Sequence, residues 1–537
     1  MKISKVLLIS LSLLLFIILV ACNGDDETKE AETTEDGKVK LTALITKHPL
    51  TKDLEDIEWL QEAEERAGVE IEWEEVTADW DQKKGAMLAG GDIPDLLIGP
   101  NVITDADFAK FTGLFEDLSP LIAEGGPNVQ AMFDEQPLTE ALSLQKDGEI
   151  FGLPKYQQFW PETATMQFIN QQWLDNLGLE TPTNWDELYD VLLAFDQEDA
   201  NGNGDPNDEI AMDFAPVATA GFGFFHPTVL LGSTGMTITG GGGQGYFLED
   251  GEVKNFFTDE RYKEVVMFLH KLYDSGLINE EVFTQDYTKY QSLARGEGDV
   301  AKLGYTFGWE RTDRFGLEIA DQYETFAPMK MSEDYDGEVS WTYDYNELNY
   351  GINFLAMSSQ TANKEAAMRF INEIYDPEVS LQVLFGSMGT NIEEVSEGSY
   401  KVLPPADETM DPGTWKWTST WADNGPMFVS DTLEVELGTD MKAVGEQQGP
   451  FIETFESLDV DNNVLPGMFL KYSDEDNNQM ALVNTDLMNL GITKFGEWIT
   501  TGGIENQWDD YVNEMNKIGL PNNNEIIQSY YDDYKSN

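Results

Sequence analysis

The segment VKLTALITKHPLTKDLEDIEWLQEAEERAGVEIEWEEV at residues 39–76 indicates the fold class. Residues 39–45 are mostly apolar and β-prone, which predicts a strand. Residues 53–67 place their apolar side chains near one face of a helix, and Gly68 follows as a suitable C-terminal cap. Residues 69–76 alternate apolar and acidic side chains, the period of a half-buried strand. The segment therefore predicts a strand, a helix and a second strand in succession.

The same alternation continues along the chain. A further helix should lead to Gly90 and Gly91, and residues 94–99 then form a short buried strand. Strands that alternate with helices predict a parallel α/β sheet. Later helices are expected from Thr183 as N-cap, over residues 261–275, and after Asn363 as N-cap. Because a chain of 537 residues is too long for one typical core, we expect at least two lobes.

The composition excludes several classes of protein. The formal net charge is −68, which is too acidic for a nucleic-acid binder, since that function needs Lys and Arg to neutralise phosphate. Anionic lipid headgroups would repel such a surface. Cys22 is the only cysteine, so the chain cannot form an internal disulfide. Stability must therefore come from packing, with a contribution from a metal ion where one binds.

The N-terminus resembles a bacterial lipoprotein signal. Lys2 and Lys5 precede the apolar residues 6–20, a run that is short for a bilayer span, and small Ala21 stands directly before Cys22. We expect residues 1–21 to be a signal peptide and Cys22 to be the lipidated first residue of the mature protein. An ordinary secretory signal beside a chance cysteine and a retained transmembrane anchor are the alternatives. The acidic segment at residues 22–37 is expected to be a flexible tether.

Several motifs together resemble bacterial extracellular solute-binding proteins of family 1, the lipoproteins that serve carbohydrate ABC importers. Each motif is weak alone, but their order and spacing are specific over nearly the whole mature chain. They are MLAGGDIPD at residues 87–95, GLFEDLSP at 113–120, IFGLP at 150–154, WLDNLGL at 173–179, PTNWDEL at 182–188, LYDSGL at 272–277, WDDY at 508–511 and IIQSY at 526–530.

The resemblance implies an α/β, two-lobed, periplasmic-binding-protein-like fold of type II. Each lobe would be a doubly wound sheet flanked by helices, with a hinge between the lobes and the ligand in the cleft. Carried over to this chain, lobe one comprises residues 38–158 plus 355–410. Lobe two comprises residues 159–354 plus 411–537.

The loop DANGNGDPNDE at residues 199–209 has the pattern of a calcium site. Oxygen-bearing side chains alternate along it and two glycines permit a tight reversal, as a cation with six to eight oxygen ligands requires. It departs from an EF-hand because Ile210 stands at the twelfth position, and a solvated acidic turn is the alternative. The family carries a similar loop with structural calcium. We expect structural Ca²⁺ held by Asp199, Asn201, Asn203, Asp205, Asp208 and Glu209. The poorer copy at residues 459–463 is interpreted as a turn.

No motif indicates catalysis. The chain has three histidines and no Gly-x-Ser-x-Gly nucleophile motif, and the Gly-x-Gly-x-x-Gly at residues 240–245 is followed by YFLE rather than a helix. His270 is expected to be a packed residue. Sugars present apolar faces that stack on aromatic rings and hydroxyls that need polar partners. We expect ligand contacts from His48, Trp80, Trp160, Trp309, Trp341 and Trp417.

These observations predict a non-enzymatic, lipid-anchored, solute-binding protein on the extracellular face of the cell membrane. It would capture a carbohydrate, which we expect to be an oligosaccharide, in the interlobe cleft and deliver it to the transmembrane subunits of an ABC permease. We expect a monomer with no nucleic-acid partner. The alternatives are a surface polysaccharide-degrading enzyme, and a sugar-sensing or adhesion protein on the same fold.

Overall fold

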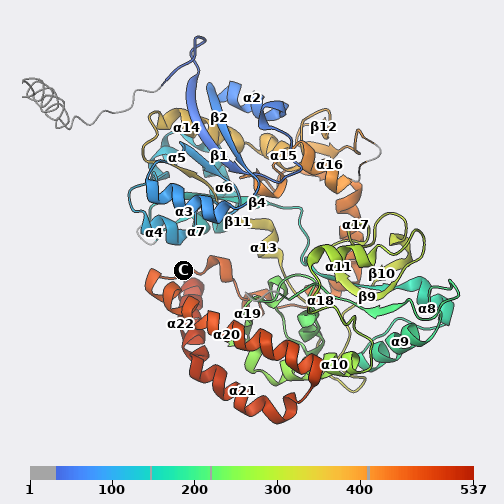
Figure 1. The fold of residues 1–537 in the computed structure, drawn as a ribbon. Helices are drawn as coiled ribbons and strands as arrows, with labels where there is room; N and C mark the ends of the chain where they lie inside the picture. The colour runs from blue at the N-terminus through green and yellow to red at the C-terminus, as the bar shows by residue number, and fades with distance from the viewer. Residues whose placement is uncertain (1–31, 146–147, 218–220, 408–409, 411, 537) are drawn as a thin grey trace, which may run out of the picture.

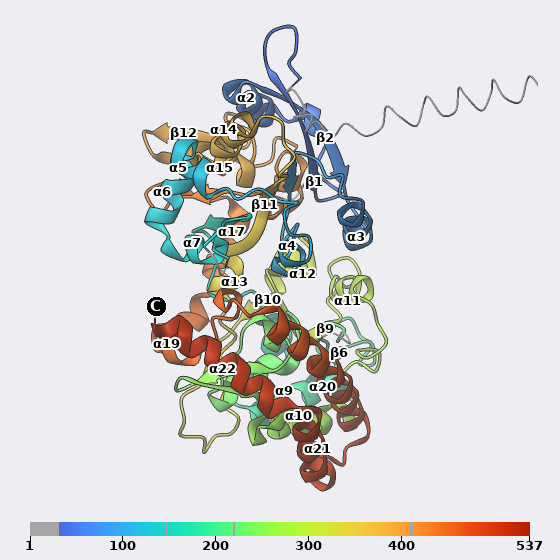
Figure 2. The same ribbon diagram turned by 90° about the vertical axis from the view of Figure 1, so that its left-hand side faces the viewer.

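The computed structural model of the protein describes residues 32–145, 148–217, 221–407, 410 and 412–536. The expected signal peptide and Cys22 lie outside these residues, as does most of the expected tether. The described chain forms two α/β lobes, one above the other in Figure 1 and seen from the side in Figure 2. Each lobe is built around its own sheet and its own buried core.

The first lobe is built on a six-stranded mixed sheet in the order β14-β4-β11-β3-β1-β2. β1 pairs in parallel with β2 and β3, as the alternating pattern predicted, whereas β11 runs antiparallel to β3 and β4. The strands are β1 (Val39–Thr46), β2 (Val69–Val76), β3 (Leu96–Ile98), β4 (Gly152–Gln157), β11 (Tyr350–Met357) and β14 (Phe428–Val429).

Helices of the first lobe cover this sheet, and they follow the expected amphipathic pattern. Trp59, Leu60, Ala63 and Ala67 of α2 are buried, and Gly68 ends that helix in the left-handed conformation. The helices are α2 (Glu58–Ala67), α3 (Trp80–Gly90), α4 (Asp105–Lys110), α5 (Ser119–Gly125), α6 (Pro127–Glu135), α7 (Pro137–Ser143), α14 (Lys364–Ile374), α15 (Pro377–Phe385) and α16 (Pro412–Thr418). A small sheet of β12 (Ile392–Ser396), β13 (Ser399–Val402) and β15 (Glu434–Glu436) adjoins them.

The second lobe is built on a four-stranded sheet in the order β10-β5-β9-β6, with β6 and β9 parallel and the other pairs antiparallel. Its strands are β5 (Met166–Asn170), β6 (Ile210–Met212), β9 (Leu303–Gly308) and β10 (Tyr323–Thr325), and a separate hairpin joins β7 (Tyr246–Glu249) to β8 (Glu252–Asn255). The helices are α8 (Gln171–Leu177), α9 (Trp185–Gln197), α10 (Glu260–Asp274), α11 (Tyr287–Ala294), α12 (Arg311–Phe315), α18 (Ile452–Glu456), α19 (Val460–Asn463), α20 (Asp474–Thr501), α21 (Ile504–Ile518) and α22 (Leu520–Ser536).

Three connections cross between the lobes. The first leaves β4 and enters β5, and the second passes through α13 (Tyr345–Asn349) into β11. The third is α17 (Thr439–Gln447), which runs from the first lobe to the second on the right of Figure 1. The expected boundary at residues 410 and 411 is therefore too early, because α16, β14 and β15 still belong to the first lobe.

Two local predictions are also corrected. The N-cap of α9 is Asn184 rather than Thr183, because the Asn184 side chain accepts the Glu187 N–H, whereas the Thr183 hydroxyl donates to the Glu187 carboxylate. The segment at residues 459–463 is not a plain turn, since Val460–Asn463 form the short helix α19. Asn363 does cap α14, as expected, by accepting the Ala366 N–H.

In the part of the chain that the structure describes, none of the helices is both long enough and apolar enough to span a membrane.

Candidate ligand-binding site

Four half-buried rings form an aromatic row that reaches from the first lobe to the second. His48 follows β1, and Trp417 lies in α16, and their rings stack with centroids 4.2 Å apart. Trp160 follows β4 on the first connection and meets Trp309, which follows β9, at 5.3 Å in an edge-to-face arrangement. The row is defined by His48, Trp417, Trp160 and Trp309, all of which the sequence analysis singled out.

Lys416 joins the two halves of this aromatic row. Its ammonium lies 5.7 Å from the ring centroid of Trp417 and 5.0 Å from that of Trp160. A cation at this distance from an aromatic face is attracted to it. Asn349 holds the backbone of Trp160, because its side chain accepts the Trp160 N–H at 3.2 Å and donates to the Trp160 carbonyl at 3.3 Å. The row therefore lies directly beside the hinge connections.

A partly buried polar network adjoins the row. Asp423 stands 3.7 Å from the Lys416 ammonium and 3.9 Å from that of Lys155. Burial lowers the pKa of Lys155, with the Asp423 carboxylate acting in the opposite direction. Gln157 donates to Asp423 at 3.4 Å, while its own carbonyl oxygen is buried without a partner in the described chain. The network offers both donors and acceptors close to the aromatic faces.

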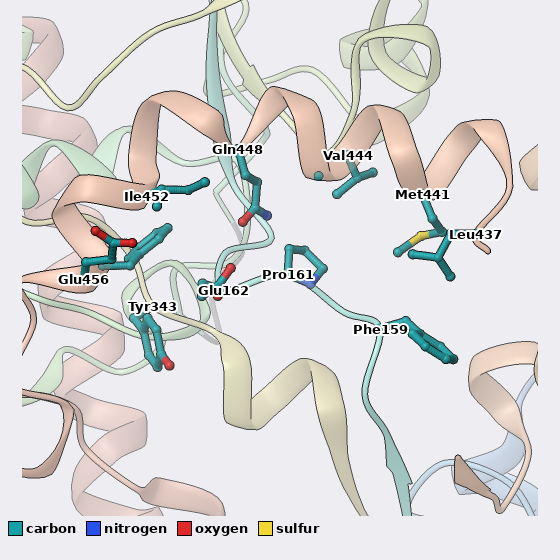
Figure 3. A pocket seen from close by; sticks show the side chains of 12 residues that line it. Phe159, Pro161, Glu162, Tyr343, Leu437, Met441, Val444, Gln448, Ile452 and Glu456 are labelled. Atoms are coloured by element: carbon teal, nitrogen blue, oxygen red, sulfur yellow. The ribbon is translucent and has the colours of Figure 1, made fainter. Parts of the chain in front are cut away.

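A pocket of 380 Å³ lies between the three connections (Figure 3). Phe159, Pro161 and Glu162 of the first connection line one side, and Met441 and Gln448 on and just after α17 line the other. Trp160 belongs to the same connection as these first residues, so the pocket adjoins the aromatic row. Movement of one lobe against the other must change the shape of this pocket, because all three hinge segments border it.

Two expected ligand contacts lie elsewhere. Trp341 is fully buried in the core of the second lobe, where its indole donates to the Thr165 carbonyl at 2.6 Å and packs against Phe451. The structure therefore corrects the expectation that Trp341 lines the cleft. Trp80 is half-buried at the start of α3 and donates to the Val102 carbonyl at 3.0 Å, so it supports the first lobe and is not part of the aromatic row.

The expected calcium loop folds back on itself. Gly202 and Gly204 have φ angles of 72° and 96°, and the Gly204 N–H donates to Asp199 at 3.0 Å. One carboxylate oxygen of Asp199 and one of Glu209 are buried without a partner in the described chain. Burial raises the pKa of Glu209, and the nearby carboxylates of Asp208 and Asp199 raise it further.

These unpaired, mutually repelling oxygens fit a cation at this loop. The described side chains contain no group of three His, Cys, Asp or Glu arranged to hold a metal ion. In this loop the amide groups of Asn201 and Asn203 donate to the Asp208 carboxylate. Each of the six expected ligand side chains nevertheless carries an oxygen atom, and oxygen is the ligand atom that Ca²⁺ prefers.

Comparison with known proteins fits this geometry. The family model for bacterial extracellular solute-binding proteins matches residues 50–380. The chain belongs to this family. It is 27% identical over 549 residues to the fructooligosaccharide ABC transporter substrate-binding protein FusA of Streptococcus pneumoniae, an alignment that covers 97% of this chain and 96% of FusA.

Solved structures of other solute-binding proteins have the same two-lobed type II fold. An extracellular solute-binding protein from Bifidobacterium longum subsp. infantis is 30% identical, with a TM-score of 0.86 over 94% of this chain and all of that one. An HMO binding, ABC-transporter associated solute-binding protein from the same organism is 31% identical, with a TM-score of 0.85 over 93% of this chain and 99% of that one. A FusA structure described as an EF-hand mutant in complex with fructo-nystose is 26% identical, with a TM-score of 0.78 over 93% of this chain and 99% of that one.

The sequence analysis of this solute-binding protein did not identify the polar side chains beside the aromatic row. Lys416 could have been found, because it stands between Trp415 and Trp417 in the motif WKW. No local sequence pattern marks Asp423 or Gln157 as part of the site. They come together only because the end of β4 packs against the segment that follows α16. Among 100 acidic residues, sequence alone cannot single out one carboxylate of this kind.

Proposed function

We propose that the protein is the carbohydrate-binding subunit of an ABC-type importer and that the aromatic row binds an oligosaccharide. The observation that carries this proposal is the row itself, since rings from both lobes and from the hinge contact one another, directly or through Lys416. Apolar sugar faces stack on such rings, and the hydroxyls can pair with Lys416 and Asp423. The name of FusA, which specifies fructooligosaccharides, supports the same class of ligand.

The mechanism follows from the placement of the row. A ligand that contacts Trp417 in the first lobe and Trp309 in the second gains more contacts when the lobes close. Such a ligand shifts the equilibrium toward the closed form by its difference in affinity for the two states. The closed form would present both lobes to the permease. Micromolar affinity, about −8 kcal/mol, is sufficient for capture and still allows release.

The decisive experiment is a screen of neutral oligosaccharides by thermal shift, followed by calorimetry on Trp160→Ala and Trp309→Ala. We expect one class of glycan to raise the melting temperature and each variant to weaken its binding at least tenfold. Trp73→Ala is the matched control, because Trp73 is also half-buried but lies against Trp421 and Phe370. Binding that survives in both row variants, or product formation from the glycan, would refute the proposal.

Two further parts of the proposal concern the calcium loop and the N-terminus. Ca²⁺ held by Asp199, Asn201, Asn203, Asp205, Asp208 and Glu209 would have a structural role, because the loop lies in the second lobe and contributes no residue to the aromatic row. Lipidation of Cys22 would hold the protein at the extracellular face of the membrane. The lipobox-like sequence before Cys22 supports this anchor.

A further inference from the structure

A second pocket, of 260 Å³, lies in the first lobe where α17 begins. Its walls come from the end of β13, the start of α16, and the turn from β15 into α17. We call it the lysine pocket and define it by Asn391, Lys401, Trp415, Lys416, Gly438 and Lys442. None of these residues was assigned a ligand contact in the sequence analysis.

The charge of the lysine pocket is opposite to that of the whole chain. Lys401, Lys416 and Lys442 line it, against one lining carboxylate, that of Glu436. Glu436 lies 3.0 Å from the Lys442 ammonium and 3.9 Å from that of Lys401, so a single acid is shared by two lysines. The protein has 32 basic and 100 acidic residues, so a random sample of its surface would be negative, whereas this pocket has more lysines than carboxylates.

Buried polar atoms without partners also line the pocket. Asn391 is only 2% exposed, and neither its amide nitrogen nor its carbonyl oxygen has a partner in the described chain. The indole nitrogen of Trp415 is likewise buried and unpaired in this part of the structure. A buried polar group without a hydrogen bond costs about 1–3 kcal/mol. A ligand that accepts hydrogen bonds from these two N–H groups would remove that cost.

The N-terminus of α17 completes the positive end of the pocket. Its N-cap is Gly438, which has no side chain to accept the first backbone N–H groups, and no side-chain cap is formed. The free N–H groups and the dipole of a helix favour an anion at this end. Lysines, orphaned N–H donors and an uncapped helix therefore converge on the same volume.

Lys416 links the lysine pocket to the aromatic row. It lines the pocket, and its ammonium also lies 5.0 Å from the ring of Trp160. A sugar unit stacked on that ring would have the pocket next to it. A charged substituent on the adjacent unit of the same chain would then be directed toward the lysines.

We propose that the lysine pocket binds the carboxylate of an acidic sugar unit, so that the protein accepts oligosaccharides carrying uronic acids. This inference rests on the proposed carbohydrate function, because it treats the pocket as an extension of the same site. Lys401 and Lys442 pair with the carboxylate, the N–H groups of Asn391 and Trp415 donate to it, and the aromatic row holds the neighbouring unit.

The test measures the affinity of the full chain for trigalacturonate and for its fully methyl-esterified form, in which a methyl group on each carboxyl removes the negative charge. We expect the acid to bind at least tenfold more tightly than the ester at low salt, with the difference shrinking at high ionic strength. Lys401→Gln together with Lys442→Gln should abolish the difference. The side chain of Lys401 is 41% exposed and that of Lys442 is 49% exposed, so the double variant should fold normally.

The control removes the same charge far from the pocket, in Lys271→Gln together with Lys289→Gln. These lysines pair with Asp186 and Glu281 on the second lobe, and their loss should leave the preference for the acid intact. Equal affinity for acid and ester, or no binding of the acid, would overturn the inference. Binding of inorganic phosphate or sulfate alone, lost in the Lys401 and Lys442 variant, would also overturn it and would show a site for a free oxyanion. Neutral oligosaccharides are measured in parallel. If neither they nor trigalacturonate bind, the proposed carbohydrate function fails, whereas binding of neutral glycans with no preference for the acid overturns only this extension.

Discussion

At the scale of single residues, His226 shows how burial fixes a protonation state. Its Nδ1 accepts the Gly223 N–H at 2.9 Å, which leaves the proton on Nε2, and Nε2 donates to the Pro216 carbonyl at 3.0 Å. Burial lowers the pKa of His226 from 6.5 to about 4, against a smaller opposing effect of the Pro216 carbonyl. The imidazolium has no acceptor for a second N–H here, so the folded protein holds the neutral ring.

This arrangement makes stability depend on pH. Well above pH 6.5 the imidazole is neutral in both the folded and the unfolded state, and the native interactions are fully present. As the pH falls through 6.5 the unfolded chain binds a proton, whereas the folded protein binds one only near pH 4, so the free energy of unfolding falls. Between pH 7.5 and pH 5 we expect His226 to reduce the free energy of unfolding by about 2 kcal/mol. Urea denaturation at both pH values measures it. In His226→Gln, whose amide can replace both hydrogen bonds, the pH-dependent loss should be smaller by that amount; an unchanged slope would contradict the assignment.

Residue type predicted some members of the aromatic row, but it also selected rings that lie elsewhere. The grouping of His48, Trp160 and Trp309 could be expected because each lies just after a strand, where side chains reach a cleft, whereas Trp417 lies within α16 and was singled out by its residue type. Trp341 has the same local setting on a loop, yet it fills the core beneath the second connection. What separates Trp341 from Trp160 is the packing of a segment distant in sequence, here Phe451, and no local pattern reports that.

At the scale of elements, the loop at residues 199–209 should show its role when calcium is removed. A ligand that binds only the folded state stabilises it by about 2.7 kcal/mol at a concentration of 100 times Kd. We therefore expect EDTA to lower the melting temperature by several degrees, on the order of 5 °C. Ca²⁺ should restore it, and Mg²⁺ at the same concentration should restore less, because Mg²⁺ demands tighter octahedral geometry.

The matched variants for this loop are Asp199→Asn and Glu209→Gln, which remove charge at the two carboxylates with unpaired oxygens. Each should melt at the temperature of the EDTA-treated protein and should no longer respond to EDTA. Asp205→Asn lies in the same loop, where its carboxylate accepts from Asn207, and should respond more weakly. A wild-type protein that is indifferent to EDTA and retains no calcium by elemental analysis would contradict a metal role for the loop.

Helices and strands of the first lobe were predictable because their patterns are local. Residues 39–76 specify β1, α2 and β2 through alternation, helical spacing and Gly68, and the structure has all three. The third connection was not predictable in this way. α17 has the composition of an ordinary surface helix, and its crossing is set by partners on both lobes, such as the Gln447 side chain that accepts the Arg311 N–H.

At the scale of the whole molecule, the proposed lipid anchor and the proposed binding site lie in separate parts of the chain. Every residue of the aromatic row lies within the two described lobes, whereas Cys22 precedes the first described residue. The affinity of the lobes for a ligand should therefore not depend on lipidation. The proposed anchor would instead keep the protein at high effective concentration near the proposed permease.

Cys22→Ala separates these two contributions. The variant should leave the membrane fraction and appear in the medium, because one covalent attachment is removed and the acidic surface gives anionic lipids no electrostatic attraction. Its affinity for a glycan, measured by calorimetry on purified protein, should match that of the wild type within twofold. Uptake by cells should fall even though binding is intact, since diluted protein meets the permease less often. Trp160→Ala is the complementary control, because it should stay with the membrane while losing affinity. Weaker glycan binding by the purified Cys22→Ala protein would mean that the N-terminal segment contributes to the site, and its retention at the membrane would mean that a second attachment exists.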